Sequence, residues 1–137
     1  MKSKFQEANP FSHLILDNFF NSTQLKSVFK SLLSEKFERK ESDLFSLSQT
    51  QDFESSKNPF LQNFRKFLIS KEFISHIESL TKLELNKNKI SISGSLYEDA
   101  DYLLCHDDKL ENRKIAFMIY LNQVKGGTLD FFSSKNN

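Results

Sequence analysis

The chain has 137 residues, 38% of them hydrophobic, which allows one globular domain and gives no sign of a second. Its net charge of +1 lacks the basic excess of a nucleic-acid-binding domain, and no stretch is apolar for long enough to span a bilayer, so we expect neither nucleic acid nor membrane as a partner. The single cysteine, Cys105, excludes an internal disulfide and a cysteine-rich zinc module, and we expect an intracellular protein.

The first predicted elements are a strand and a helix. Residues 13–20 (HLILDNFF) are predicted as a strand that joins a sheet formed later in the chain. Asn21 and Gln24 have the spacing of a capping pair, so a helix is predicted from about Ser22 to Phe37. Its apolar residues fall on one helical stripe: Leu25, Val28, Phe29, Leu32 and Leu33.

A polar stretch separates this helix from the next helical signals. Residues 40–57 are rich in Ser, Gln, Asp and Glu, and we expect a surface excursion there. Asn58 and Pro59 fit the first positions of a second helix, which Ser70 restarts or bends. The helical region as a whole is predicted over about residues 21–86.

After about Asn88 the apolar pattern changes to one typical of strands. Alternation and short apolar runs predict strands around Ile90 and Ile92 and at residues 102–104, 114–122 (KIAFMIYLN) and 128–132 (TLDFF). A Gly-Gly turn separates the last two. The order predicts an α+β domain with its sheet region over about residues 88–132.

A histidine and two aspartates stand together between the predicted strands. Side chains alternate across extended backbone, so His106 and Asp108 would project to one face and Asp107 to the other. One imidazole and one carboxylate are two of the three ligands in the 2-His-1-carboxylate site that binds Fe(II) in oxygenases. So short a motif also arises by chance, and the alternative is a set of polar residues at a strand end.

The residues around the motif extend the pattern. From Tyr97 the sequence reads Y-x(8)-H-D-D-x-L-E-x-R-x-I-A-F-x-x-Y-L, and G-G-T-L-D follows from Gly126. With residues 43–53 and 58–85, this segment resembles the Fe(II)- and 2-oxoglutarate-dependent prolyl hydroxylases that modify a small-subunit ribosomal protein. The resemblance covers about residues 17–132 and implies a partial double-stranded β-helix, a jelly-roll oxygenase core, with the N-terminal helices packed on its outer side.

The resemblance also implies roles for individual residues. His106 and Asp108 match the first two Fe(II) ligands. Tyr120 matches a tyrosine that helps to hold the distal carboxylate of 2-oxoglutarate, and Tyr97 matches a second tyrosine of that pocket. The alternative for Tyr120 is a core tyrosine with a satisfied hydroxyl. The resemblance further implies dioxygen as co-substrate, ascorbate as reductant, a ribosomal-protein proline as substrate, and a place in the cytoplasm or nucleus.

Two features of the family pattern have no counterpart in these 137 residues. They are a distal histidine that completes the iron site and an arginine that pairs with 2-oxoglutarate. His13, His76, Arg39, Arg65 and Arg113 match neither position. The expectation is therefore a single, C-terminally truncated domain over residues 1–137 and a poor oxygenase. The alternative function is a non-catalytic remnant or partner-binding fragment that can self-associate through uncovered sheet edges.

Other candidate chemistry is weaker. Cys105 and His106 are adjacent, and neighbouring residues of a strand face opposite sides, so they are not expected to form a catalytic pair. The acidic residues Glu98, Asp99 and Asp101 lack the glycine spacing of a calcium loop, and we expect a solvated loop there.

Overall fold

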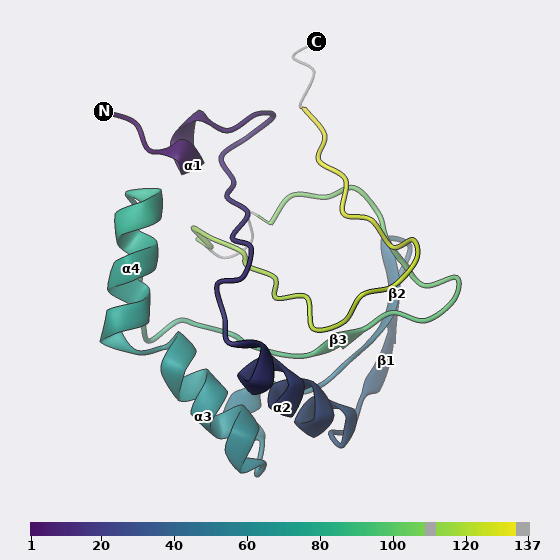
Figure 1. The fold of residues 1–137 in the computed structure, drawn as a ribbon. Helices are drawn as coiled ribbons and strands as arrows, with labels where there is room; N and C mark the ends of the chain where they lie inside the picture. The colour runs from purple at the N-terminus through teal and green to yellow at the C-terminus, as the bar shows by residue number, and fades with distance from the viewer. Residues whose placement is uncertain (109–111, 134–137) are drawn as a thin grey trace.

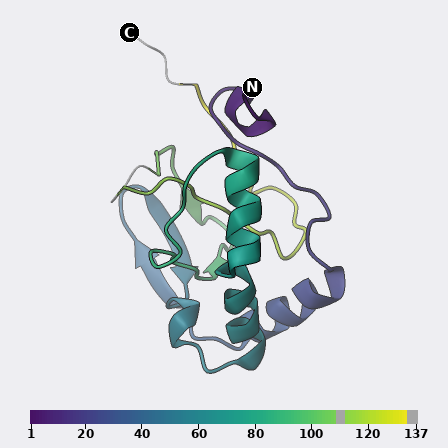
Figure 2. The same cartoon turned by 90° about the vertical axis from the view of Figure 1, so that its left-hand side faces the viewer.

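The computed structural model describes residues 1–108 and 112–133 and places a group of helices beside a four-stranded antiparallel sheet (Figure 1). In the view turned by 90°, α3 and α4 follow one another along the near side of the molecule, with the β1–β2 hairpin at one flank (Figure 2). Within the described ranges, no helix is long and apolar enough to cross a membrane. The elements in chain order are α1 (Lys4–Glu7), α2 (Ser22–Leu33), β1 (Glu38–Glu41), β2 (Phe45–Gln49), the 3-10 helix η1 (Phe53–Ser55), α3 (Pro59–Leu68), α4 (Lys71–Thr81), β3 (Ser95–Leu96) and β4 (Tyr102–Leu103).

The predicted helix starts are confirmed, and each has a side-chain cap. Asn21 accepts hydrogen bonds from two backbone N–H groups at the start of α2, at 2.9 and 3.2 Å. Asn58 does the same at the start of α3, at 2.9 and 3.3 Å. Ser70 caps α4, so the predicted restart at this serine is a break between two helices. These oxygens satisfy donors that have no partner inside the helix.

Helix α2 is shorter than predicted. It ends at Leu33 and not near Phe37, because the chain turns after Ser34 to enter β1 at Glu38. Phe37 lies outside the helix but still packs, partly buried, against the core. The helix was therefore predicted too long, because Phe37 is an apolar residue that packs on the core from outside the helix.

The core lies where α2 and α3 meet the segment that leads into β3. Its buried members are Val28, Leu32, Phe53, Leu61, Phe64, Leu68 and Ile92. Helix α2 approaches the chain at Gly94 so closely that a Cβ there would lie 2.3 Å from Leu32 Cδ1. Phenylalanine rings continue the apolar contacts towards α4, where the centroids of Phe67 and Phe73 are 5.2 Å apart.

The sheet is organised around β2, and this corrects the prediction for residues 40–57. Strand β1 pairs antiparallel with one edge of β2. Strands β3 and β4 both pair with the other edge, β3 at Ser48 and Gln49 and β4 at Phe45 and Ser46. The expected surface excursion therefore contains the central strand. Its sequence, FSLSQ, has few apolar residues, and two of its three partner strands, β3 and β4, are distant along the chain.

Four other strand predictions are wrong. The residues around Ile90 and Ile92 and residues 13–20, 114–122 and 128–132 are all described, and none of them forms a strand; β3 begins only at Ser95. Ile119 and Leu121 are partly buried against the core, whereas Phe117, Met118 and Tyr120 are exposed. The apolar pattern correctly indicated that Ile119 and Leu121 face the core. A strand also needs a partner strand with which its backbone forms hydrogen bonds, and the pattern gives no information about that partner. The α+β class is confirmed as a mixed helix and antiparallel sheet architecture.

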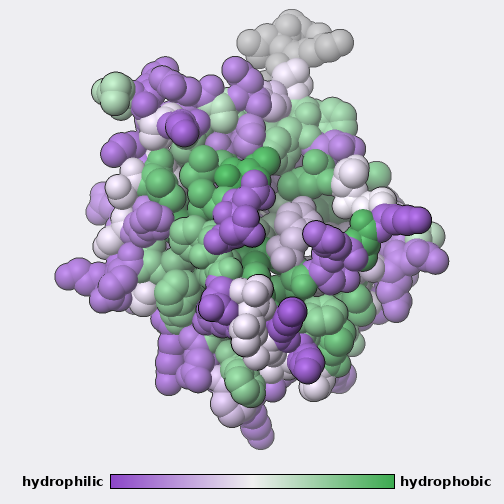
Figure 3. All heavy atoms as spheres, in the orientation of Figure 1, coloured by the Kyte–Doolittle hydropathy of each residue, from purple (hydrophilic) through white to green (hydrophobic). Residues whose placement is uncertain are grey.

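The segments near the two ends of the chain lie side by side. The Phe131 ring contacts Phe11 and His13, with centroid separations of 4.9 and 4.7 Å. In Figure 1 the C-terminal segment, green to yellow, crosses in front of the sheet beside the N-terminal segment. Apolar side chains gather on this face of the molecule (Figure 3).

Candidate metal centre

The sheet positions His106 through the strand that precedes it. Strand β4 pairs with the start of β2, and the Leu104 N–H donates to the Leu44 carbonyl at 2.8 Å. The chain then leaves the sheet, and His106 Nδ1 lies 2.8 Å from the Leu104 carbonyl oxygen. A hydrogen bond from Nδ1–H to this carbonyl fixes the ring tautomer that leaves the Nε2 lone pair available to a metal ion.

The structure brings His106 and Asp108 together. His106 Nε2 lies 3.3 Å from Asp108 Oδ1, and the two side chains are 35% and 53% exposed. Two donor atoms that share one ion at about 2.1 Å, at roughly a right angle, lie about 3 Å apart. The pair therefore fits two adjacent positions around one metal ion. The proximity does not come from strand alternation, because residues 104–108 lie outside β4.

The other histidines lie elsewhere. His13 Nδ1 is 2.8 Å from the Phe11 carbonyl oxygen, and His76 stacks on Phe19 with ring centroids 5.7 Å apart. Among the described residues, no group of three or more His, Cys, Asp or Glu side chains could hold a metal ion. The role of His106 and Asp108 as ligands stays a prediction.

The tyrosines predicted to hold 2-oxoglutarate interact with one another. Partial burial raises the pKa of Tyr97, and the negative charges of the ionised Tyr120 and of the Asp101 carboxylate raise it further. Tyr120 is 65% exposed, so the alternative of a core tyrosine is wrong. The third tyrosine, Tyr102, is the donor of a long hydrogen bond, 3.4 Å, to the Ser42 carbonyl on the neighbouring turn.

The expected solvated acidic loop is wrong for one of its three residues. The Asp101 side chain is only 5% exposed and forms an ion pair with Arg39 of β1. This pairing, together with the Glu98 N–H that donates to the same carboxylate, lowers the pKa of Asp101 to about 2. Arg39 matches no position of the family pattern in the sequence. Nothing local in the sequence signals the contact, because 62 residues separate the partners.

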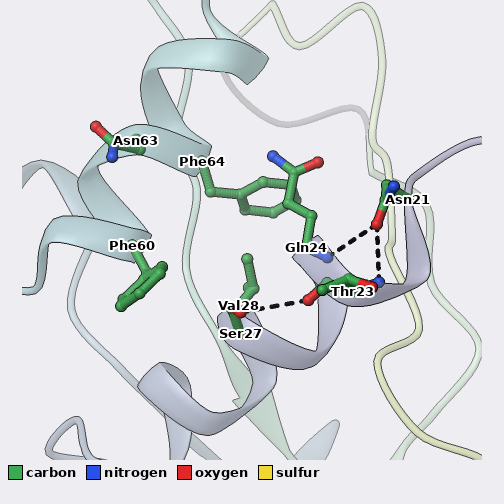
Figure 4. A pocket seen from close by; sticks show the side chains of 8 residues that line it. All are labelled: Asn21, Thr23, Gln24, Ser27, Val28, Phe60, Asn63 and Phe64. Carbon is green, nitrogen blue, oxygen red and sulfur yellow. Dashed lines mark hydrogen bonds between the residues drawn. The ribbon is translucent and has the colours of Figure 1, made fainter.

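A groove lies away from these residues, between α2 and α3, with a volume of about 590 Å³. Figure 4 shows that amide and hydroxyl side chains surround the buried Phe64 there, and no ionisable residue lines the groove. The groove therefore lacks the ionisable side chains expected of a metal or co-substrate site.

Comparison with known proteins shows which protein family the chain resembles. Residues 90–137 match the sequence model of the 2OG-Fe(II) oxygenase superfamily. In alignments of 133 positions that cover 93% of the chain, it is 36% identical to a prolyl 3-hydroxylase of Mus musculus and 34% identical to one of Xenopus laevis. In an alignment of 145 positions, gaps included, that covers 92% of the chain, it is 30% identical to a prolyl 3,4-dihydroxylase of Ostreococcus tauri.

The chain spans about a quarter of these relatives, 24%, 26% and 28% of their respective lengths. All four predicted site residues, Tyr97, His106, Asp108 and Tyr120, lie inside the segment that matches the superfamily. Residues 90–137 are thus similar to the 2OG-Fe(II) oxygenase superfamily, and nearly the whole chain is similar to one part of proteins named prolyl hydroxylases.

Proposed function

We propose that the chain is the part of a prolyl hydroxylase that holds Fe(II) and contacts 2-oxoglutarate. The observation that carries the proposal is the pair His106 Nε2 and Asp108 Oδ1, 3.3 Å apart within the segment that matches the superfamily. The hydrogen bond between His106 and the Leu104 carbonyl supports it, because metal-bound histidines commonly donate their second ring N–H in this way.

Each residue has a defined task in this proposal. His106 and Asp108 hold the metal ion, and the Leu104 carbonyl keeps the imidazole turned towards it. The hydroxyls of Tyr97 and Tyr120 donate hydrogen bonds to the distal carboxylate of 2-oxoglutarate. When bound, Fe(II) supplies the oxidative chemistry, in which dioxygen and 2-oxoglutarate are consumed, a prolyl carbon is hydroxylated, and succinate and carbon dioxide are released.

The finer parts of the proposal follow the resemblance in sequence. They are a jelly-roll core that includes β2, β3 and β4, a proline of a small-subunit ribosomal protein as substrate, and ascorbate as the reductant that keeps iron in its Fe(II) state. Residues 1–137 form one domain in this proposal, and the protein acts in the cytoplasm or the nucleus.

Metal binding tests the site before any reaction is measured. Mn(II), a redox-stable probe, is added to the purified protein under anaerobic conditions, and free Mn(II) is followed by electron paramagnetic resonance. His106→Ala and Asp108→Ala should each weaken binding by at least about tenfold. His76→Ala removes an exposed imidazole that stacks on Phe19 and should leave binding unchanged. Tight binding that survives His106→Ala and Asp108→Ala would overturn the assignment.

Succinate formation from 2-oxoglutarate, with a proline-containing ribosomal peptide as acceptor, tests the reaction itself. Any succinate formed should disappear in His106→Ala and Asp108→Ala and persist in His76→Ala. Succinate that persists in the His106 variant would show that the reaction uses other residues.

One observation favours a second candidate, a non-catalytic fragment that binds a partner chain. Large apolar side chains of the C-terminal segment are exposed, and patches of this kind mark interaction surfaces. They are Phe117, Met118, Tyr120, Val124, Leu129, Phe131 and Phe132. A protein that binds no Mn(II) but self-associates in light scattering would support this candidate over the oxygenase.

A further inference from the structure

Arg39 and Asp101 join two parts of the sheet that are far apart in sequence. Arg39 Nη1 donates to Asp101 Oδ2 at 3.0 Å, and Nη2 donates to Asp101 Oδ1 at 2.5 Å. The same Nη2 donates to Ser46 Oγ on the intervening strand. A planar guanidinium that meets both oxygens of one carboxylate fixes its partner in orientation as well as in distance.

The carboxylate that Arg39 holds also closes a turn. Asp101 Oδ2 accepts the Glu98 N–H at 2.8 Å, and the Asp101 N–H donates back to the Glu98 carbonyl at 3.0 Å. Ala100, inside this turn, has a left-handed backbone with φ +69°. Such a conformation is unfavourable for alanine and needs support from its surroundings, which the Asp101 hydrogen bonds provide.

Tyr97 directly precedes this turn. Strands β3 and β4 pair with the same edge of β2, at its opposite ends, so residues 97–101 have to leave that edge and return to it. Arg39 reaches this excursion from β1, on the far edge of β2. The backbone position of Tyr97 is thus set by β3 on one side and by the Asp101 turn on the other.

We propose that Arg39 and Asp101 are positioning residues of the 2-oxoglutarate site, which hold Tyr97 in place through the turn of residues 98–101. The inference rests on the proposed function, because it takes Tyr97 as a contact of the co-substrate. Arg39 has a second effect. An unpaired Asp101 near Tyr97 would repel the two carboxylates of 2-oxoglutarate, and the guanidinium neutralises that charge.

Tyrosine titration tests this positioning without metal or co-substrate. The chain has three tyrosines and no tryptophan, so phenolate absorbance reports on Tyr97, Tyr102 and Tyr120 alone. The step that disappears in Tyr97→Phe belongs to Tyr97. The Arg39→Ala substitution can change the Tyr97 pKa in two opposite ways. If Tyr97 stays in place, the unpaired Asp101 carboxylate raises the Tyr97 pKa. If the turn is released and Tyr97 becomes more exposed to water, the Tyr97 pKa falls.

We expect the Tyr97 pKa to fall towards its ordinary value of 10.0 in Arg39→Ala. Arg39→Lys keeps the charge but loses the fork, and should shift the pKa in the same direction by less. Glu41→Gln alters the other carboxylate on Arg39, 3.2 Å from Nε, and should change nothing. Circular dichroism checks that each variant is folded. An unchanged or raised Tyr97 pKa in folded Arg39→Ala or Arg39→Lys would overturn the proposal.

Calorimetry on the Mn(II)-loaded protein extends the test to the co-substrate. Arg39→Ala should weaken 2-oxoglutarate binding by about tenfold or more and leave Mn(II) binding unchanged, as expected for a residue that acts through another. Unchanged 2-oxoglutarate binding in this variant would overturn the positioning role. Failure of the wild-type protein to bind Mn(II) would instead contradict the proposed function, and the tyrosine titration would still decide the positioning of Tyr97.

Discussion

Leu32 of α2 lies directly over Gly94, and a Cβ added to this glycine would be 2.3 Å from Leu32 Cδ1. The glycine backbone is held on both sides by Thr50, whose hydroxyl accepts the Gly94 N–H at 2.9 Å and whose N–H donates to the Gly94 carbonyl at 2.9 Å. Because these hydrogen bonds hold the glycine backbone and Leu32 is buried in the core, an added Cβ has to displace the leucine side chain. Glycine is therefore what allows α2 to pack on the segment leading into β3.

Gly94→Ala should destabilise the fold by about 1–3 kcal/mol, the usual cost of forcing a methyl group into a packed core. Urea denaturation gives the free energy of unfolding. The Leu32→Ala background removes the clashing atoms, so the alanine at 94 should cost less there than in the wild type. Equal costs in the two backgrounds would show that Leu32 does not determine the need for glycine.

Asn58→Ala should lower the free energy of unfolding by about 1 kcal/mol, because it removes the oxygen that caps two N–H groups of α3. Helix α3 contributes Leu61, Phe64 and Leu68 to the core, so its start matters for the whole domain. Asn58→Asp keeps a capping oxygen and serves as the control. If both substitutions cost the same in urea denaturation, the cap is not the cause.

Asp101→Asn should change how stability responds to acid. The Arg39 ion pair holds the folded-state pKa of Asp101 at about 2, below its ordinary value of 3.8. The unfolded chain therefore binds more protons between these values, and the stability that Asp101 contributes is complete above about pH 4 and lost towards pH 2. Thermal unfolding at a series of pH values should show a shallower loss for Asp101→Asn in this window. A slope identical to that of the wild type would contradict the assignment.

Mn(II) should raise the melting temperature of the wild-type protein more than that of Asp108→Asn. An ion that binds only the folded state stabilises it by about 2.7 kcal/mol at a concentration one hundred times its dissociation constant. Removing the Asp108 carboxylate weakens binding and reduces this gain. Asp17→Asn, at an exposed position away from the motif, controls for the loss of one negative charge. Equal Mn(II)-induced shifts in all three proteins would contradict the ligand role of Asp108.

Helices α2, α3 and α4 could be predicted from the sequence because their causes are local, whereas the short helices α1 and η1 were not predicted. Asn21, Asn58 and Ser70 each cap N–H groups two or three residues ahead, and the apolar stripes repeat within single helices. The sheet could not be predicted in the same way. Strand β2 has few apolar residues, and it is a strand because β1, β3 and β4 pair with it. Residues 114–122 have the stronger strand pattern but no strand partner in the structure.

The candidate site likewise contains a local contact that could be predicted from the sequence and a long-range contact that could not. His106 and Asp108 are two residues apart, so chain connectivity by itself keeps them close, and the sequence determined that pair. Only the tertiary structure decided that Asp101 is paired, since its partner Arg39 stands 62 residues earlier and on the other edge of β2. A short segment fixes its own contacts through covalent geometry and nearby hydrogen bonds, whereas a contact across the sheet depends on how every intervening element packs.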